Sequence, residues 1–180
     1  MRQIRTPPLF VVRWCILSII GSMSDLFHER LRHIEAKFCE LKTSAPCDIT
    51  DTPKTAGVYV FYENGKPLYV GKSDNIAKRM GNHRRPSSRH NQATFAARIA
   101  EDELEKKGYK LKKYIPTKSL EHYTKHPQFD EVFNAAKERI KKMTICWVEE
   151  KESTNQTILE IYAAVTLGTI EKGYNNFENH

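Results

Sequence analysis

The sequence predicts an α+β fold in which helices flank a small three-stranded antiparallel sheet. Three observations lead to this fold class. Two β-rich runs flank an Asn-Gly turn, a third run of alternating residues follows much later, and the other long segments repeat apolar residues at helical spacing. The chain has 180 residues, 28% of them charged and 39% hydrophobic, which is enough to bury one core. We therefore expect one folded domain.

The first predicted helix covers residues 24–42, with Ser24 or Asp25 as its N-cap. Its apolar residues recur at steps of three and four and define one face of an amphipathic helix: Phe27, Leu31, Ile34, Phe38 and Leu41. This face is expected to pack on the core.

The segment before this helix contains a twelve-residue apolar run, Leu9 to Ile20, which is too short to span a bilayer. We expect residues 1–22 to be a dispensable N-terminal extension upstream of a start at Met23, and residues 23–180 to form the domain. Mass spectrometry of the native N-terminus tests this expectation, and abundant peptides from residues 1–22 would contradict it.

A β-hairpin is predicted next, with strands at residues 57–62 and 67–71 joined around Asn64 and Gly65. Ser73 or Asp74 can cap the helix that follows. The remaining elements are helices at about 75–83, 92–107, 129–140 and 154–169 and a third strand at 143–148. The last helix is expected to bury Ile158, Ile161, Tyr162 and Val165, and residues 84–142 form an insertion between the second helix and the third strand.

The second predicted strand ends in Gly71-Lys72-Ser73, which matches the end of a phosphate-binding P-loop. That loop requires another glycine five positions before Gly71, where this chain has Lys66, and Gly65 is out of register by one. The turn is already explained by the hairpin, so a nucleotide-binding loop is disfavoured.

Several ionisable side chains lie along the hairpin and the helices. With regular pairing around the turn, Tyr59 faces Val70 and Tyr69 faces Val60, so the two tyrosines point to opposite faces of the sheet. A bulge near Tyr69 or a looser turn would be needed to bring them to one site. Arg79 and His83 are four residues apart and share a helix face. Glu160 lies off the apolar stripe of the last helix, beside small residues. Taken singly, each is more often a packing or solvated residue than a functional one.

The order of these residues, however, resembles the GIY-YIG nuclease superfamily. Gly57-Val58-Tyr59 and Tyr69-Val70-Gly71 match its two name-giving tripeptides, each with Val in place of Ile, and Arg79 follows the second tyrosine by ten residues. The resemblance is strong over residues 55–83 and looser over 143–176. It implies a divalent-metal-dependent endonuclease that hydrolyses DNA phosphodiester bonds.

The resemblance also implies roles for individual residues. Tyr59 and Tyr69 correspond to the catalytic tyrosines, Arg79 to the phosphate-binding cation and Glu160 to the ligand of Mg²⁺ or Mn²⁺. Lys72 and Asn75 match supporting positions, as does a late asparagine, for which Asn175 fits best and Asn176 is an alternative. His83 stands where relatives carry Tyr or His, and we expect Tyr59 to act as the general base with His83 assisting. Tyr69 is the third candidate for the base, and neighbouring cations could favour the Tyr59 phenolate or let this tyrosine relay a proton.

Charge and cysteine content bear on the partner and the setting. The net charge is +7 and the pI about 9.2, which favours an anionic partner such as DNA. Basic residues after the hairpin are the expected nucleic-acid contacts: Arg84, Arg85, Arg89 and Arg98. The group Lys106, Lys107, Lys110, Lys112 and Lys113 is either a second contact or a solvated face. Four scattered cysteines without a CxxC pair favour a reducing, cytoplasmic location.

We therefore expect a stand-alone nuclease, with a restriction-type role preferred. The alternative is a nucleic-acid-binding module of the same fold that has lost cleavage. The joint presence of Tyr59, Tyr69, Arg79 and Glu160 argues against this alternative, because a binding module does not need all four.

Overall fold

The structure, a computed structural model, describes residues 9–109 and 124–177, with side chains from residue 25 onward. Four antiparallel strands form one sheet in the order β1-β4-β2-β3. They are β1 (Cys47–Asp48), β2 (Gly57–Glu63), β3 (Lys66–Ser73) and β4 (Thr144–Glu149). The α+β class is confirmed, but the expected strand count of three is wrong. The missed strand has two residues and exists through pairing with β4, so no alternating pattern marks it.

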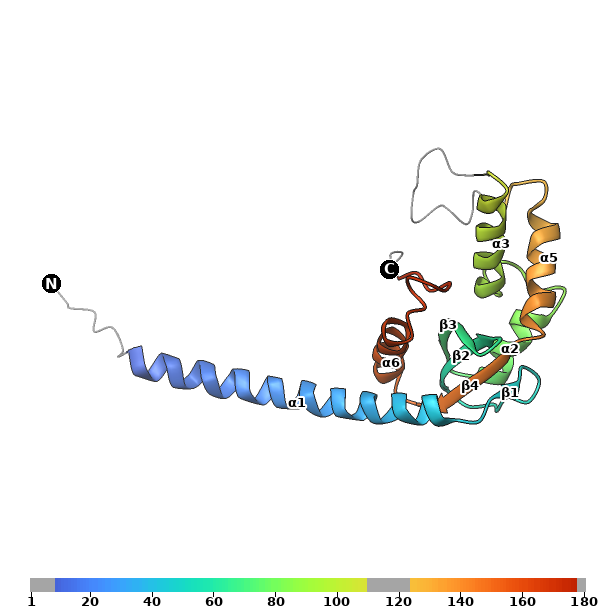
Figure 1. Cartoon of the computed structure of the whole chain (residues 1–180). Helices are drawn as coiled ribbons and strands as arrows, with labels where there is room; N and C mark the ends of the chain where they lie inside the picture. The colour runs from blue at the N-terminus through green and yellow to red at the C-terminus, as the bar shows by residue number, and fades with distance from the viewer. Residues whose placement is uncertain (1–8, 110–123, 178–180) are drawn as a thin grey trace.

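Helices cover both faces of the sheet (Figure 1). On one face lie α1 (Leu9–Thr43) and α6 (Ser153–Thr166), and on the other lie α2 (Ile76–Arg84), α3 (Thr94–Lys106) and α5 (Phe129–Ile140). The sheet is therefore a middle layer between two helical layers. Each predicted helix is present. The observed ends lie within a few residues of the predicted ends, except that α1 begins much earlier than predicted.

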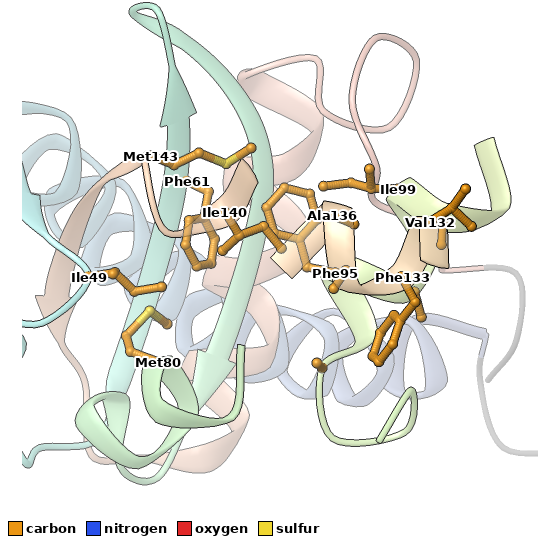
Figure 2. Packing of buried hydrophobic residues seen from close by; sticks show 14 of the residues in the cluster. Ile49, Phe61, Met80, Phe95, Ile99, Val132, Phe133, Ala136, Ile140 and Met143 are labelled. Atoms are coloured by element: carbon orange, nitrogen blue, oxygen red, sulfur yellow. The ribbon is translucent and has the colours of Figure 1, made fainter. Parts of the chain in front are cut away.

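The larger hydrophobic core lies between the sheet and α2, α3 and α5 (Figure 2). Phe61 of β2 packs there among Met80, Phe95 and Ile140. The opposite face of the same strand carries Val58 and Val60, which pack against α1 and α6. Because successive strand residues point to opposite faces, a strand buried on both sides has the nearly continuous apolar sequence seen in β2.

The first helix starts earlier than expected. α1 begins at Leu9, so Ser24 and Asp25 lie inside the helix, and neither is its N-cap. Phe27, expected in the core, is 56% exposed, and the fully packed residues begin at Ile34. Figure 1 shows the reason, because the N-terminal part of α1 extends beyond the sheet and α6. Within the part of the chain that the structure describes, no helix has the length and apolar character required to cross a membrane.

The buried face of α6 also differs from the expected one. Ile161 and Val165 are 44% and 57% exposed, whereas Leu159, Ala163 and Ala164 are buried against the strands. Alanine side chains allow close approach of the helix to the sheet, and in this orientation Ile161 and Val165 face outward. Consequently the side chain next to Leu159, Glu160, lies at the edge of the packed face.

Asn75 is the N-cap of α2, and the expected caps Ser73 and Asp74 are wrong. The Asn75 side-chain Oδ1 accepts a hydrogen bond of 2.9 Å from the backbone N–H of Lys78. The Ser73 hydroxyl instead accepts from the Asn75 N–H at 3.1 Å and donates to the Asn75 carbonyl at 2.9 Å. Together these bonds fix the strand-to-helix turn from which Arg79 projects.

Candidate active site

A β-bulge places Tyr59 and Tyr69 on the same face of the sheet. Next to the turn, Tyr62 pairs with Pro67, as regular pairing predicts. Leu68 is then an extra residue in β3, and beyond it Phe61 pairs with Tyr69. The regular pairing that would put the two tyrosines on opposite faces is therefore wrong beyond the turn, and the bulge that a shared site requires is present.

The bulge also places Tyr59 opposite Gly71. The Tyr59 ring lies over this glycine, and a Cβ built on Gly71 would come within 2.6 Å of the Tyr59 Cζ atom. No side chain larger than hydrogen fits there without moving the ring. Packing of the Tyr59 ring in the first tripeptide therefore requires a glycine at position 71 in the second tripeptide.

We expect the substitution Gly71→Ala to destabilise the fold by about 1–3 kcal/mol, because the added methyl group overpacks a fully buried ring. Gly81→Ala is the matched control. A Cβ at Gly81 would have its nearest neighbour, an Arg85 side-chain nitrogen, at 3.5 Å. Because alanine is also favoured in a helix, this variant should be neutral or up to about 1 kcal/mol more stable. Urea denaturation measures both, and equal stabilities would contradict the steric account.

The Arg79 guanidinium lies at the centre of the site. Its Nε donates a hydrogen bond to the Tyr59 hydroxyl at 3.2 Å. Its Nη1 donates to the Gln92 backbone carbonyl at 3.0 Å, and its Nη2 donates to the Thr94 hydroxyl at 2.7 Å. The Tyr69 hydroxyl also interacts with Arg79. A planar cation held in this way is suited to binding phosphate oxygens.

The environment of Tyr59 keeps its hydroxyl protonated. The side chain is fully buried. Burial raises the pKa of Tyr59, nearby Tyr69 raises it further, and Arg79 opposes both only in part. This direction is opposite to the expectation that neighbouring cations would favour a phenolate. Tyr59 is therefore a hydrogen-bond donor and acceptor at neutral pH, and the phenolate form is disfavoured.

His83 is enclosed by aromatic rings. Its ring centroid lies 5.4 Å from that of Phe61, 6.4 Å from those of Tyr59 and Tyr69, and 6.3 Å from that of Phe95. Burial, followed by the charge of Arg79, lowers the pKa of His83 to about 3. Neither ring nitrogen has a hydrogen-bond partner among the described residues. His83 is thus a neutral imidazole one helical turn from Arg79.

Glu160 approaches the site from the other helical layer. Burial raises the pKa of its carboxyl, although the Lys72 side chain, the Lys72 backbone N–H and Arg79 all favour the charged form. The charges of Glu160 and Tyr59 also influence each other, so the carboxylate lies within electrostatic range of the tyrosine and the arginine. Lys72 is thereby placed beside Glu160, on the α6 side of the strand.

The donor set around Glu160 fits a hydrated hard cation. No group of three or more His, Cys, Asp or Glu side chains that could hold a metal occurs in the described ranges. One partly desolvated carboxylate matches Mg²⁺ or Mn²⁺, which keep water ligands and use oxygens of the substrate. A zinc site with three or four protein ligands does not fit these residues.

Asn175 supports the strand that carries Tyr69. Its Oδ1 accepts from the Val70 N–H at 2.8 Å, and its Nδ2 donates to the Val70 carbonyl at 2.9 Å. The preceding residue, Tyr174, donates its backbone N–H to the Leu68 carbonyl at 2.8 Å. The segment Gly173–Asn175 therefore lies along the outer edge of β3 and satisfies the backbone groups there. Asn175, rather than Asn176, holds this position.

The predicted basic contacts fall in different places. Arg84 and Arg85 line a hollow of about 360 Å³ at the end of α2, together with Lys141. Arg89 is exposed on the loop that follows. Arg98 lies on α3, where its Nη1 pairs with the Glu101 carboxylate at 3.2 Å, and it lines a different hollow.

The lysines predicted as a second contact or a solvated face lie partly on α3 and partly after it. Lys106 pairs with Asp102 at 2.6 Å and Glu103 at 3.2 Å. Lys110, Lys112 and Lys113 lie outside the residues that the structure describes.

Sequence reasoning missed the two acceptors that orient Arg79. Thr94 is the first residue of α3, and the other acceptor, on Gln92, is a backbone carbonyl. Neither carries a local signal, since both roles arise from how α3 packs beside α2. Lys141, the third cation of the hollow, was also missed, because it lies near the end of the insertion whereas Arg84 lies at its start.

Comparison with known proteins agrees with this geometry. The family model described as the GIY-YIG catalytic domain matches residues 55–175, which is most of the chain and includes the tripeptides, Arg79, Glu160 and Asn175. No curated protein sequence and no solved structure matches significantly. The family match and the site on which the hairpin, α2 and α6 converge lead to one conclusion: the chain belongs to the GIY-YIG nuclease superfamily.

Proposed function

We propose that the protein is a metal-dependent endonuclease that hydrolyses phosphodiester bonds of DNA. The observation that carries this proposal is the convergence of Arg79, the Tyr59 hydroxyl and the Glu160 carboxylate from three separate elements. A fixed guanidinium within electrostatic range of a carboxylate supplies a phosphate-binding cation and a ligand for a hard metal ion. The basic balance of the chain supports a polyanionic substrate.

Each side chain has a role in this proposal. Arg79 binds the phosphoryl oxygens and stabilises the charge that develops on them during displacement. Glu160 would hold Mg²⁺ or Mn²⁺, and the bound ion would supply neutralisation of the leaving oxygen and polarisation of the phosphate. Tyr59 donates or relays a proton as a neutral hydroxyl, and Tyr69 lies on the same face of the sheet and takes part in this proton transfer. Neutral His83 closes the aromatic side of the site. Its lowered pKa disfavours the protonated imidazole.

Incubation of supercoiled plasmid DNA with Mg²⁺ or Mn²⁺ tests the proposal. The wild-type protein should convert the plasmid to nicked or linear forms, EDTA should stop the reaction, and Glu160→Ala should not cut. The competing function is DNA binding without cleavage. Binding in a gel-shift assay with no nicking in either metal would favour that alternative.

We also propose that the hollow lined by Arg84, Arg85 and Lys141 contacts a DNA phosphate beyond the cleavage site. Arg84 lies five residues beyond Arg79 along α2, roughly 7.5 Å at the helical rise. Lys141 pairs with Glu138 at 2.6 Å, and the two arginines complete the positive lining. Contacts of this kind give affinity and salt sensitivity rather than sequence selection.

Neutralising these cations should weaken DNA binding in a salt-dependent manner. Arg84→Ala, Arg85→Ala and Lys141→Ala should each reduce the slope of log K against log salt by about 0.9, the value for one phosphate contact. Lys37→Ala removes one charge from α1, on the other side of the sheet, and should leave the slope unchanged. Fluorescence anisotropy over a salt series measures the slopes. Equal slopes for all four variants would remove this hollow from the interface.

We further propose that the enzyme works in a reducing, cytoplasmic setting. Free thiols at Cys39, Cys47 and Cys146 support that setting. A restriction-type role is consistent with the insertion at residues 84–142, which supplies the arginines of the hollow. Cleavage of defined plasmids followed by end sequencing distinguishes a sequence-specific enzyme from a non-specific one.

A further inference from the structure

The loop between α2 and α3, residues 85–93, is fixed by its own hydrogen bonds. The Ser88 N–H donates to the Arg85 carbonyl at 3.2 Å, and the N–H groups of Gln92 and Ala93 both donate to the Arg89 carbonyl at 2.9 Å. The Gln92 side chain accepts from the Arg89 N–H at 3.1 Å. The Gln92 carbonyl therefore has a defined position at the end of an internally bonded loop.

A buried lysine anchors the first half of this loop to α5. Lys137 is 2% exposed, and its Nζ donates to the Pro86 carbonyl at 2.7 Å and contacts the Ser88 carbonyl at 3.5 Å. The same ammonium lies 4.6 Å from the centroid of the Phe133 ring. A buried cation is stable only with such partners, so these contacts of Lys137 hold the loop against α5. The loop is thus held at one end by α5 and continues at the other into α3.

The other end of the loop, at Gln92, contacts the Arg79 guanidinium directly. At least three of the five N–H groups of Arg79 are used within the protein, by Tyr59, the Gln92 carbonyl and Thr94, and the Tyr69 hydroxyl also interacts with the guanidinium. Tyr59 holds the guanidinium at Nε, whereas the Gln92 carbonyl and the Thr94 hydroxyl hold the two terminal nitrogens. These two acceptors on the terminal nitrogens fix the rotation of the guanidinium plane, which one bond at Nε cannot do.

We propose that Thr94 is a positioning residue for cleavage: its hydroxyl, together with the Gln92 carbonyl of the anchored loop, sets the plane in which Arg79 meets the phosphate. This inference rests on the proposed function for its catalytic consequence. A guanidinium fixed before substrate binds has less freedom to lose when it forms a two-point contact with phosphate. Thr94 acts through Arg79 and does not itself contact the reacting atoms.

Two substitutions isolate the hydroxyl. Thr94→Val has the same shape without the acceptor, and Thr94→Ser keeps the acceptor without the methyl group. For Thr94→Val we expect a fall of about tenfold or more in the single-turnover cleavage rate at saturating DNA, the effect of one hydrogen bond to a charged group. The DNA dissociation constant in EDTA and the melting temperature should change little. Thr94→Ser should cleave at nearly the wild-type rate.

Nuclear magnetic resonance of the Arg79 guanidinium gives a readout that does not depend on activity. In the wild type the terminal nitrogens should show restricted rotation, and in Thr94→Val this restriction should be lost, while Thr94→Ser retains it. Unchanged rotation together with unchanged cleavage in Thr94→Val would overturn the inference, and so would Thr94→Ser cleaving as slowly as Thr94→Val. If the wild type cuts no DNA but the rotation responds as expected, the proposed function fails and the positioning of Arg79 stands.

Discussion

Replacing Glu160 with glutamine is expected to abolish metal-dependent DNA cleavage while leaving the fold intact. Glutamine keeps the size of the side chain but removes the negative charge that a hard cation requires. Since metal stabilisation of a developing charge contributes several kcal/mol, the loss of rate should be about a hundredfold or more. Plasmid nicking at saturating Mg²⁺ measures it.

The same variant should be more stable than the wild type when no metal is present. Burial raises the pKa of Glu160 above its ordinary value of 4.5, so folding favours the protonated form. The corresponding stability is fully present below the unfolded-state pKa and is lost as the pH rises through the folded-state pKa. At neutral pH the wild type therefore carries a destabilising charge that Glu160→Gln lacks.

Melting curves in EDTA from about pH 4 to pH 8 test this second effect, with Glu35→Gln, an exposed position on α1, as the matched control. The stability difference between Glu160→Gln and the wild type should grow as the pH rises. As the pH is lowered, cleavage by the wild type should begin to decline at a higher pH than it would if Glu160 had the pKa of an ordinary carboxyl group. A Glu160→Gln protein that cuts as fast as the wild type would remove this residue from the metal site.

Replacing Arg79 should have a comparable effect on cleavage for a different reason. Arg79→Ala removes the phosphate-binding cation and leaves the fully buried Tyr59 hydroxyl without its 3.2 Å donor. We expect the cleavage rate to fall by about a thousandfold, as for other arginines that stabilise a phosphoryl transition state. The fold should lose about 1–3 kcal/mol because a buried hydroxyl has lost its partner.

Arg79→Lys separates charge from geometry. Lysine keeps the positive charge but cannot reach Tyr59, Gln92 and Thr94 together, so it should recover only a small part of the lost rate. Lys78→Ala, an exposed cation on the same helix, is the control and should cut normally. Full activity of Arg79→Lys would mean that charge alone is sufficient and that the fixed plane has no role. Single-turnover rates and urea denaturation measure the two effects.

Local chemistry explains which parts of the fold could be predicted. The Asn64-Gly65 pair adopts φ values of 53° and 75°, which favour these residue types in a two-residue hairpin turn. Helical spacing likewise identified α3 and α5 to within two residues of their observed ends. In each case the determining interactions lie within a few positions of one another.

The features that could not be predicted depend on contacts distant in sequence. The bulge at Leu68 accompanies its carbonyl bond to the Tyr174 N–H, and no residue near the turn specifies it. The buried face of α6 follows from close packing of Ala163 and Ala164 on the sheet, which outweighs the larger apolar residues Ile161 and Val165. Tertiary packing thus decided both the shared face of the tyrosines and the position of Glu160.

The closure of the β3 edge by Asn175 also gives the site an order of assembly. The amide of Asn175 and the backbone of Val70 are 105 positions apart, and Glu160 also comes late in the chain. During synthesis the tyrosines and Arg79 leave the ribosome well before either partner, and chains begin to fold from their N-terminal part. A nascent chain therefore carries the phosphate-binding half of the site without its carboxylate until its last helix has been made.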